Sequence, residues 1–383
     1  MKIIILGAGL IGRPMAVDLS ADPRFLVTVA DIDEAALRRL GPAGPASGHR
    51  INTISVDLSD ANRVKDLVKD HDLVLIAVPG FMGFQTLKAV VEAGRNVVDI
   101  SFFPEDPFLL EDLTRAAGVT AIVDCGVAPG MSNILAGYLA HELDEIHRVT
   151  IYVGGLPEFR EWPYEYKAVF SPIDVIEEYV RPARYVENGE VVTKPALSDP
   201  ELLSFPGIGT LEAFNTDGLR TLAKTIRAPH LKEKTLRYPG HIEKMAMLRE
   251  TGFFSREEVQ VNGARVRPLD FTAKLLFPKW KLQEGDRDIT VMRVIVEGTK
   301  AGVGQRHTYD LLDRYDSVTR THSMARTTGY TATVVLRMLA GGMLSGRGLM
   351  APELIGAEPH CVGFLLKGLE DRGVVYNRTV ERT

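Results

Sequence analysis

The chain has 383 residues, 45% of them hydrophobic and 25% charged, with a formal net charge of −5. That length allows two domains with their own cores, and the composition is ordinary for a soluble globular protein. Neither a nucleic-acid partner nor a membrane is expected. No basic cluster is long enough to follow a phosphate backbone, and no apolar stretch approaches the roughly 20 residues of a membrane span.

The first part of the chain alternates short β-rich runs with helical patterns. Strands are expected at residues 3–6, 26–30, 53–56, 73–78, 97–100 and 120–123. Helices are expected between them at 11–20, 61–68, 86–93 and 107–116. This alternation predicts an α/β domain with a parallel, doubly wound sheet, a Rossmann domain, over residues 1–123. A Gly/Pro loop is expected at 41–48.

From about residue 146 the pattern favours antiparallel strands. They are expected in HRVTIYVGG, ARYVENGEVV, KTLRYPGHIE, EEVQVNGARVRP and ITVMRVIVEGTKAG, with hairpin turns at Asn188-Gly189 and Asn262-Gly263. Helical patterns lie within 165–180, 218–227 and 241–251. Residues 124–323 are therefore predicted to form a mixed α+β substrate and dimerisation domain. A long helix at 324–339 and the rest of segment 324–383 are expected to pack back on the first domain.

A glycine motif follows the first expected strand and opens a helix. The motif reads Gly7-Ala8-Gly9-Leu10-Ile11-Gly12. The first glycine permits a tight turn, the second lets backbone approach a pyrophosphate, and the third permits close helix–strand packing. The helix N-terminus offers N–H groups and partial positive charge to the phosphates. A dinucleotide site is expected here, the alternative being a glycine-rich turn in a fold without a nucleotide.

Asp31 ends the second strand, 19 residues after Gly12. A carboxylate at this position takes the adenosine ribose hydroxyls and repels a 2′-phosphate, so NAD is expected as the cofactor. Arg13 could reach a phosphate, which leaves NADP as the less favoured alternative.

Residues after the third, fourth and fifth strands complete the expected cofactor cleft. They are Asp57, Ala77, Val78, Pro79, Asp99 and Ser101. Asp57 lies where the adenine edge would be, or belongs to a helix N-cap run with Ser59 and Asp60. The other residues lie beside the switch point of the sheet, where the nicotinamide should pass. Asp99 and Ser101 alternatively cap the following loop.

The stretch DCGVAPGMSN ends the last expected strand of the first domain. Its candidate cofactor residues are Asp124, Cys125, Gly126, Pro129, Gly130 and Asn133. The glycines and the proline would let backbone pass close to the cofactor, with the asparagine pinning the turn. Asp124 and Cys125 would line the cleft in which hydride is transferred. Alternatively, Cys125 is there only because a small side chain fits that position. The alternative is a plain interdomain turn.

Together with the GAGLIG start and Asp31, four later motifs carry a family resemblance. They are DCGVAPGMSN, LEAFNTDGLRTL, RYPGHIEKM and MARTTGYTA. In this order they resemble the saccharopine dehydrogenase/reductase-like family, over nearly the whole chain, and most of all its lysine 6-dehydrogenase branch. The resemblance implies a Rossmann domain joined to an α/β substrate domain, commonly in a homo-oligomer (a dimer or dimer-based), and NAD(P)-linked oxidation of an amine carbon or the reverse imine reduction.

One departure favours the lysine branch. Family members that make saccharopine usually carry a leucine–aspartate–proline–glycine turn where this chain has Val127-Ala128-Pro129-Gly130. The expected reaction is NAD-dependent oxidation of the ε-amino carbon of L-lysine. The alternatives are a saccharopine or carboxyspermidine-type enzyme and, from another class, a non-catalytic dinucleotide sensor. Against the sensor, the polar motifs of the second domain keep their ionisable residues.

Lysine oxidation requires a neutral amine, although a free ε-ammonium has a pKa near 10.4. His241 is the leading candidate for base or proton shuttle, or it caps a helix after Pro239-Gly240. Arg220 would grip the α-carboxylate bidentately, the alternative being an exposed arginine in a helix's first turn. Glu212 and Asp217 would receive the α-ammonium or cap a helix.

Other polar residues carry weaker expectations. Tyr166 and Lys167 are catalytic candidates that a solvated helix face would also explain, and Arg326 with Thr327 and Thr328 would close over the cofactor or only dock the long helix. No zinc site is expected, because His241 and Glu243 lack an HExxH partner and two cysteines form no cluster; Cys361 has only a packing role. Two cysteines also make no disulfide framework, which favours a reducing cytoplasm. No GxSxG elbow marks a hydrolase.

Overall fold

The computed structural model describes residues 1–40, 51–283, 285–344 and 346–383. The expected loop at 41–48 lies outside the described residues. The chain divides into two compact units. The first contains Met1–Glu142 and Ala325–Tyr376, and the second contains Leu143–Met324 and Asn377–Thr383.

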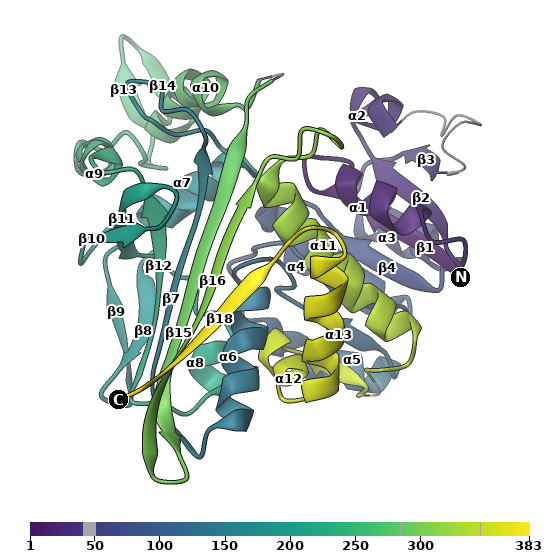
Figure 1. The fold of residues 1–383 in the computed structure, drawn as a ribbon. Helices are drawn as coiled ribbons and strands as arrows, with labels where there is room; N and C mark the ends of the chain where they lie inside the picture. The colour runs from purple at the N-terminus through teal and green to yellow at the C-terminus, as the bar shows by residue number, and fades with distance from the viewer. Residues whose placement is uncertain (41–50, 284, 345) are drawn as a thin grey trace. The chain divides into compact units, whose positions relative to one another are not determined.

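The first unit is built on a seven-stranded parallel sheet with the order β17-β6-β5-β4-β1-β2-β3. The strands are β1 (Lys2–Leu6), β2 (Leu26–Asp31), β3 (Ile51–Ser55), β4 (Leu73–Ile76), β5 (Asn96–Asp99), β6 (Thr120–Ile122) and β17 (Gly348–Met350). Figure 1 labels β1 to β4. Strands β1 and β4 to β6 are buried along almost their whole length, as expected for parallel strands covered on both faces. The predicted Rossmann class is confirmed.

Helices alternate with these strands. They are α1 (Gly12–Ser20), α2 (Glu34–Leu40), α3 (Ala61–Val68), α4 (Gly80–Glu92), the 3₁₀ turn η1 (Pro107–Leu110) and α5 (Glu111–Ala117). The core between α3, α4 and the sheet is made of aliphatic side chains such as Val64, Leu87, Val90 and Val97. Parallel strands need such crossovers, and this places every strand-to-helix loop at one edge of the sheet.

The first unit extends past residue 123 and takes up residues near the end of the chain. It includes α6 (Met131–Glu142), α11 (Ser323–Ala340) from Ala325 onward, α12 (Pro352–Gly356) and α13 (Pro359–Glu370). Strand β17 joins the sheet beside β6 in parallel register, with Gly348 opposite Thr120. Helices α6 and α12 pack closely, because a Cβ on Gly137 would lie 2.1 Å from the carbonyl oxygen of Glu353.

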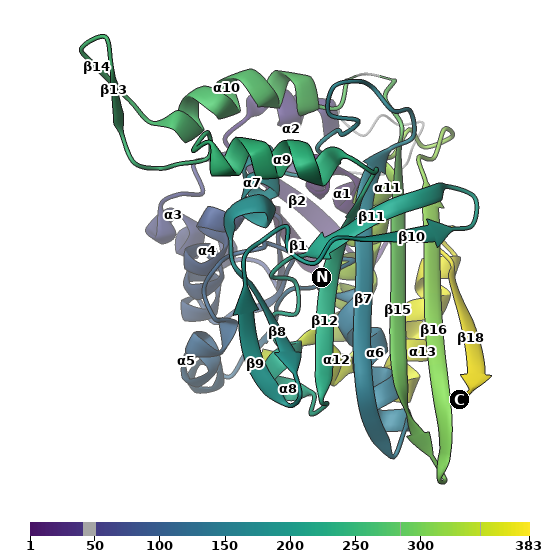
Figure 2. The ribbon, with the colours of Figure 1, turned by 90° about the vertical axis from the view of Figure 1, so that its left-hand side faces the viewer.

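The second unit is a mixed sheet of nine strands with helices. Its main path is β10-β11-β12-β7-β15-β16-β18, and the β8–β9 hairpin joins it through β12. The strands are β7 (Glu145–Pro157), β8 (Ala183–Glu187), β9 (Glu190–Lys194), β10 (Glu201–Phe205), β11 (Gly209–Asn215), β12 (His230–Arg237), β15 (Asp288–Lys300), β16 (Val303–Arg314) and β18 (Tyr376–Arg382). Figure 2 shows β7, β15, β16 and β18 side by side.

Four helices and a separate hairpin complete this unit. They are α7 (Pro172–Val180), α8 (Leu222–Thr225), α9 (His241–Glu250) and α10 (Pro268–Trp280), with β13 (Val259–Val261) and β14 (Ala264–Val266). The hairpin turns occur at the two expected Asn-Gly pairs, where Asn188 and Asn262 have φ angles of 52° and 50°. Such left-handed conformations are what this dipeptide supplies.

One local expectation for the second unit was wrong. Strand β12 pairs antiparallel with β11 but parallel with β7, because a long crossover that contains α7 separates β7 from β12. The helices expected within 165–180 and 218–227 are present but shorter than those ranges. Helix α7 begins at Pro172, after an irregular segment, and α8 is one turn, which Arg220 precedes with a φ angle of 52°.

Candidate functional site

In the first unit the glycine motif makes a tight loop between β1 and α1. Gly7 has a φ angle of 114°, and a Cβ there would lie 2.4 Å from the carbonyl oxygen of Ala77. A Cβ on Gly12 would lie 2.0 Å from the carbonyl oxygen of Gly7. Both positions therefore require glycine. A Cβ on Gly9 would meet nothing within 4 Å, so this residue faces open space beside the loop.

The N-terminus of α1 lies at the end of this loop. Its N-cap residue, Ile11, makes no side-chain cap, and Leu10 is exposed beside it. In the first turn of this nine-residue helix the N–H of Arg13 donates to the carbonyl oxygen of Gly9 at 3.2 Å, and Pro14 has no N–H. A helix N-terminus without a side-chain cap, next to a glycine that leaves backbone accessible, is a feature that binds a pyrophosphate. The residues present therefore fit a dinucleotide.

Asp31 links the end of β2 to the glycine loop. Its Oδ2 accepts a hydrogen bond from the backbone N–H of Ala8 at 2.6 Å, and its Oδ1 accepts one from the N–H of Asp33 at 2.8 Å. A carboxylate has about four acceptor positions, so ribose hydroxyls can still donate to it. Asp33 accepts from the N–H of Ala35 at the start of α2, which adds a second acid at this strand end. Arg13 is exposed.

The loops after β3 and β4 lie at the same sheet edge as the glycine loop. Asp57 is half-buried, and hydrogen bonds from Ser59 hold its pKa below the usual value. The N-cap of α3 is Asp60, whose carboxylate accepts from the N–H groups of Asn62 and Arg63. Asp57 therefore shapes the turn without capping the helix. After β4, Ala77 contacts the glycine loop, Val78 is buried, and Pro79 is the N-cap of α4.

Asp99 and Ser101 form a buried pair after β5. The hydroxyl and the backbone N–H of Ser101 both donate to Asp99 Oδ1, at 2.6 and 2.9 Å. A Cβ on Gly83 would lie 2.2 Å from the hydroxyl of Ser101, so α4 packs directly on this pair. The N–H of Cys125 donates to the carbonyl oxygen of Asp99 at 2.8 Å, which joins the loops after β5 and β6.

The turn between β6 and α6 is closed by its own backbone. The N–H of Gly126 donates to the carbonyl oxygen of Pro129 at 3.0 Å, and the Ala128–Pro129 peptide bond is cis. Asn133 Oδ1 accepts from the N–H of Gly130 at 3.3 Å, while its amide donates to Glu353 of α12. The preceding residues Asp124 and Cys125 are buried, and burial raises the pKa of the Cys125 thiol.

In the second unit His241 belongs to a buried aromatic cluster. Its Nδ1 lies 2.9 Å from the carbonyl oxygen of Tyr164, so this nitrogen carries the proton and donates. Its Nε2, 2.9 Å from the hydroxyl of Tyr179, therefore accepts. Burial and the nearby charge of Arg237 lower the pKa of His241 to about 3. The imidazole is a neutral bridge within the core, and its expected role as base remains a prediction.

Two further residues of this cluster carry an ion pair. Arg237 of β12 donates to Glu178 of α7 at 2.5 Å, and its guanidinium lies over the ring of Tyr166, 4.6 Å from the centroid. Burial raises the pKa of Glu178 above its usual value despite the arginine. Sequence reasoning missed both residues, and it wrongly offered a solvated helix face as the alternative for Tyr166 and Lys167. Tyr166 is buried, and Lys167 lies between Glu161 and Asp286.

A second buried carboxyl, Glu233 of β12, lies under the LEAFNTDGLRTL motif. The hydroxyl of Thr216 donates to it at 2.6 Å, and a Cβ on Gly218 would lie 2.3 Å from its carboxyl. Burial raises the pKa of Glu233 to about 8; the Thr216 hydrogen bond opposes this shift, and the charges of Glu178 and Asp217 add to it. A strongly shifted carboxyl is a candidate acid–base group. Only the run KEKTLRYPG, where an acid falls inside a strand, could have indicated it.

The remaining sequence candidates of the second unit have defined partners. Asp217 is buried and binds Arg184 through two parallel hydrogen bonds, at 2.9 and 2.7 Å. Glu212 Oε2 accepts from the N–H of Gly240 at 3.1 Å, beside the start of α9. The placement expected for Arg220, a helix's first turn, is corrected, since its backbone is left-handed and precedes α8.

Helix α11 carries the MARTTGYTA motif. In the first unit, Arg326 donates to the carbonyl oxygen of Arg372 at 3.0 Å, and Thr328 lies against Gly126. Within the described residues, no group of three or more His, Cys, Asp or Glu side chains is arranged to hold a metal ion. No described helix combines the length and apolarity needed to cross a membrane.

The chain resembles characterised proteins along its whole length. Saccharopine dehydrogenase [NADP(+), L-glutamate-forming] of Saccharomyces cerevisiae is 23% identical, over 98% of both chains. Carboxyaminopropylagmatine dehydrogenase of a Synechocystis strain is 24% identical, over 99% of this chain and 98% of that one. The mitochondrial alpha-aminoadipic semialdehyde synthase of Mus musculus is 23% identical, and there the chain spans only 47% of the relative's length.

Solved structures show the same fold. Apo saccharopine dehydrogenase (L-Glu forming) from Saccharomyces cerevisiae superposes with a TM-score of 0.79 at 20% identity, covering 99% of both chains. The family model for the saccharopine dehydrogenase NADP binding domain matches residues 3–122. The model for the saccharopine dehydrogenase C-terminal domain matches residues 126–374. The chain therefore belongs to the saccharopine dehydrogenase family.

Proposed function

We propose that the protein is an NAD-dependent amine dehydrogenase that oxidises the ε-amino carbon of L-lysine. The products would be ammonia and allysine, which cyclises to 1-piperideine-6-carboxylate. The observation that carries this proposal is the turn after β6. Its backbone fold brings Gly126 against Pro129, and Ala128 stands where saccharopine-forming members usually carry an aspartate.

For this reaction the chain must bind the dinucleotide, remove a proton from the substrate amine and hold the substrate carboxylate. The glycine loop would hold the pyrophosphate and Asp31 the ribose of the dinucleotide, whose nicotinamide ring supplies the hydride acceptor. A base must take the proton of the ε-ammonium before its carbon loses hydride. A cation, for which Arg220 is the sequence candidate, would hold the α-carboxylate. Water then converts the imine to the aldehyde and ammonia.

Glu233 is the base that the second unit supports best. Its pKa of about 8 leaves the carboxyl able to exchange a proton near neutral pH. Thr216 connects it to Thr235, since the two hydroxyls lie 2.8 Å apart. His241 offers less, because both of its ring nitrogens are already engaged and its pKa lies near 3.

The proposed preference for NAD rests on the acids at the end of β2. Asp31 and Asp33 lie within one turn, where a 2′-phosphate would meet two carboxylates. The yeast relative and the matching family model are both named for NADP. The preference proposed for this chain is therefore a difference from them, and binding of NADH and NADPH by the purified protein tests it.

The second candidate is an enzyme that cleaves or forms a saccharopine-like secondary amine. The matches to yeast saccharopine dehydrogenase and to carboxyaminopropylagmatine dehydrogenase favour it, because they run over almost the full length of both chains. In the oxidative direction such an enzyme would release an amino acid from the adduct and would require no free lysine.

Purified protein incubated with NAD and one amine at a time separates these candidates. L-lysine, saccharopine and carboxylated polyamines are compared, and NADH absorbance is followed together with trapping of the cyclic imine. Lysine-dependent NADH with the trapped imine supports the proposal. NADH from saccharopine alone contradicts it and supports the second candidate, while dinucleotide binding without turnover on any amine would indicate a sensor.

The proposal includes a homo-oligomer, a dimer or an assembly of dimers, and a cytoplasmic location. Light scattering of the purified protein measures its molar mass in solution. A mass near 42.2 kDa, that of one chain, would contradict the assembly without affecting the proposed chemistry.

A further inference from the structure

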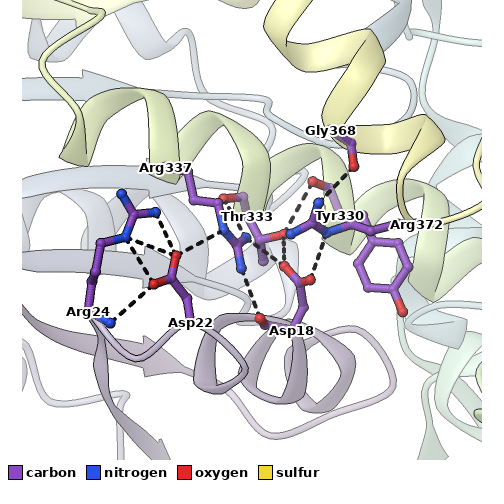
Figure 3. A network of polar contacts seen from close by, with 8 residues as sticks. All are labelled: Asp18, Asp22, Arg24, Tyr330, Thr333, Arg337, Gly368 and Arg372. Carbon is purple, nitrogen blue, oxygen red and sulfur yellow. Dashed lines mark hydrogen bonds and ion pairs between the residues drawn. The ribbon is translucent and has the colours of Figure 1, made fainter.

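Helix α1, which begins at the glycine loop, is held at its far end by side chains from the end of the chain (Figure 3). Asp18, in the last turn of α1, accepts hydrogen bonds on Oδ2 from Thr333 and Arg337, both at 2.6 Å. Its Oδ1 accepts from Arg372 at 2.7 Å. All of these residues belong to the first unit.

The network is shielded from water and anchored to backbone. The exposed fractions of the Asp18, Arg337 and Arg372 side chains are 12%, 11% and 21%. Arg337 also donates to the backbone carbonyl of Asp18 at 2.8 Å, and Arg372 to that of Gly368 at 2.7 Å. Shielded, charge-assisted hydrogen bonds to fixed backbone define a geometry more firmly than exposed ion pairs do.

Helix α11 also contacts the beginning of α1. A Cβ on Gly329 would lie 2.9 Å from Met15 Cγ and 3.6 Å from the carbonyl oxygen of Ile11, the N-cap residue of α1. The two helices therefore meet at van der Waals distance one turn after the glycine loop. Contacts at both ends of α1 fix its direction as well as its distance from α11.

Helix α11 also contacts the turn after β6, through the residue next to Gly329. A Cβ on Gly126 would lie 3.3 Å from Cγ2 of Thr328, the residue before Gly329. Helix α11 thus contacts both α1, directly after the glycine loop, and the turn at 126–130. The glycine loop and this turn are the two places in the unit where backbone is expected to approach the cofactor.

We propose that Asp18, Arg337 and Arg372 are positioning residues for the dinucleotide. By fixing the direction of α1, they set the place of the helix N-terminus and the adjoining glycine loop that would receive the pyrophosphate. The inference rests on the proposed function only for dinucleotide binding and is independent of the amine substrate. None of the three residues touches the cofactor in this account, so their effect must pass through α1.

A pyrophosphate-specific loss of affinity is the expected signature. Asp18→Asn keeps the size of the side chain and removes its charge. We expect the Kd for NADH to rise roughly three- to tenfold, as for substitutions that act through a packed element. The Kd for adenosine, which lacks the pyrophosphate, should stay unchanged. Fluorescence titration for NADH and calorimetry for adenosine supply the constants.

Arg24→Ala is the matched control. Arg24, whose side chain is 69% exposed, forms an ion pair with Asp22 just after α1 and makes no hydrogen bond or ion pair to Asp18. Asp22 also lies 3.9 Å from Arg337, and this ion pair is kept in Arg24→Ala. Its Kd for NADH should equal that of the wild type. Arg372→Lys keeps the positive charge but lacks the guanidinium group that bonds Asp18 and Gly368 together. Its Kd for NADH should lie between those of the wild type and Asp18→Asn. If Asp18→Asn does not fold, the same Kd values are measured for Thr333→Val and Arg372→Lys, which each remove one hydrogen-bond donor to Asp18.

The outcomes separate the inference from the proposed function. An unchanged Kd for NADH in folded variants overturns the inference, and so does an equal loss of NADH and adenosine binding, which indicates general loosening of the unit. Wild-type protein that binds NADH but does not oxidise lysine overturns only the proposed reaction. Wild-type protein that binds no dinucleotide overturns both.

Discussion

The glycine loop of the first unit and the buried polar cluster of the second unit are built in opposite ways. Six consecutive residues make the loop, and its contacts are backbone to backbone, as between Gly7 and Ala77. The cluster joins α7, β12 and α9 through side chains, with Arg237 between Glu178 and Tyr166. The backbone loop forms only where the chain has glycine, which can be read locally. The side-chain cluster forms only when distant residues are buried together by the fold.

The largest expected effect tests the side-chain site. Glu233→Gln keeps the hydrogen bond from Thr216 but removes the titrating group. If Glu233 is the base, kcat for lysine should fall by roughly 10²- to 10⁴-fold while the Kd for NADH stays constant. Steady-state kinetics and NADH titration measure the two. A fall in kcat of less than about threefold would show that another residue is the base. The kcat of His241→Asn, measured in the same way, tests the other candidate.

The backbone site is tested by two alanine substitutions that should differ. Gly12→Ala places a Cβ 2.0 Å from the carbonyl oxygen of Gly7, so both stability and NADH affinity should fall, the latter roughly 10- to 100-fold. Gly9→Ala meets no protein atom within 4 Å and should fold normally, yet bind NADH more weakly because its methyl group faces the phosphates. Thermal unfolding and NADH titration distinguish them. Normal NADH affinity in Gly9→Ala would place the pyrophosphate elsewhere.

These two sites also differ in how far the sequence could predict them. The place of the loop between a strand and a helix was predicted, because glycine spacing after a strand constrains only local backbone; its role in cofactor binding stays a prediction. Glu178, Arg237 and Glu233 were missed, because their importance comes from burial against elements far along the chain. Strand β17 was missed for the same reason, since three residues near the chain's end pair with β6. The parallel pairing of β12 could not be inferred either, as it depends on where the crossover returns.

The pH dependence of stability provides a smaller test of the buried cluster. The pKa of Glu233 is raised from 4.5 to about 8, so the folded state binds its proton more tightly than the unfolded state. The stability this provides is complete below pH 4.5 and is lost as pH rises to about 8. Across this window the wild type should lose roughly 4 to 5 kcal/mol relative to Glu233→Gln, at about 1.4 kcal/mol per pKa unit. Urea unfolding at several pH values measures it; parallel curves would contradict the shift.

The smallest expected effect concerns cofactor choice. Asp31→Ser removes the carboxylate expected to repel a 2′-phosphate, and it also removes the acceptor for the N–H of Ala8. The ratio of the Kd values for NADH and NADPH should shift toward NADPH by roughly tenfold. Asp33→Asn, which changes the neighbouring acid, should shift it less. An unchanged ratio in Asp31→Ser would refute the role assigned to Asp31.

The proposed reaction requires that hydride leaves the ε-carbon of lysine. L-lysine carrying two deuterium atoms at that carbon, incubated with the protein and NAD, tests it by mass spectrometry of the reduced cofactor. The account predicts one deuterium per NADH formed, one deuterium kept in the cyclic imine, and slower turnover than with unlabelled lysine. Reduced cofactor without deuterium, or reduction that occurs only with saccharopine, would contradict it.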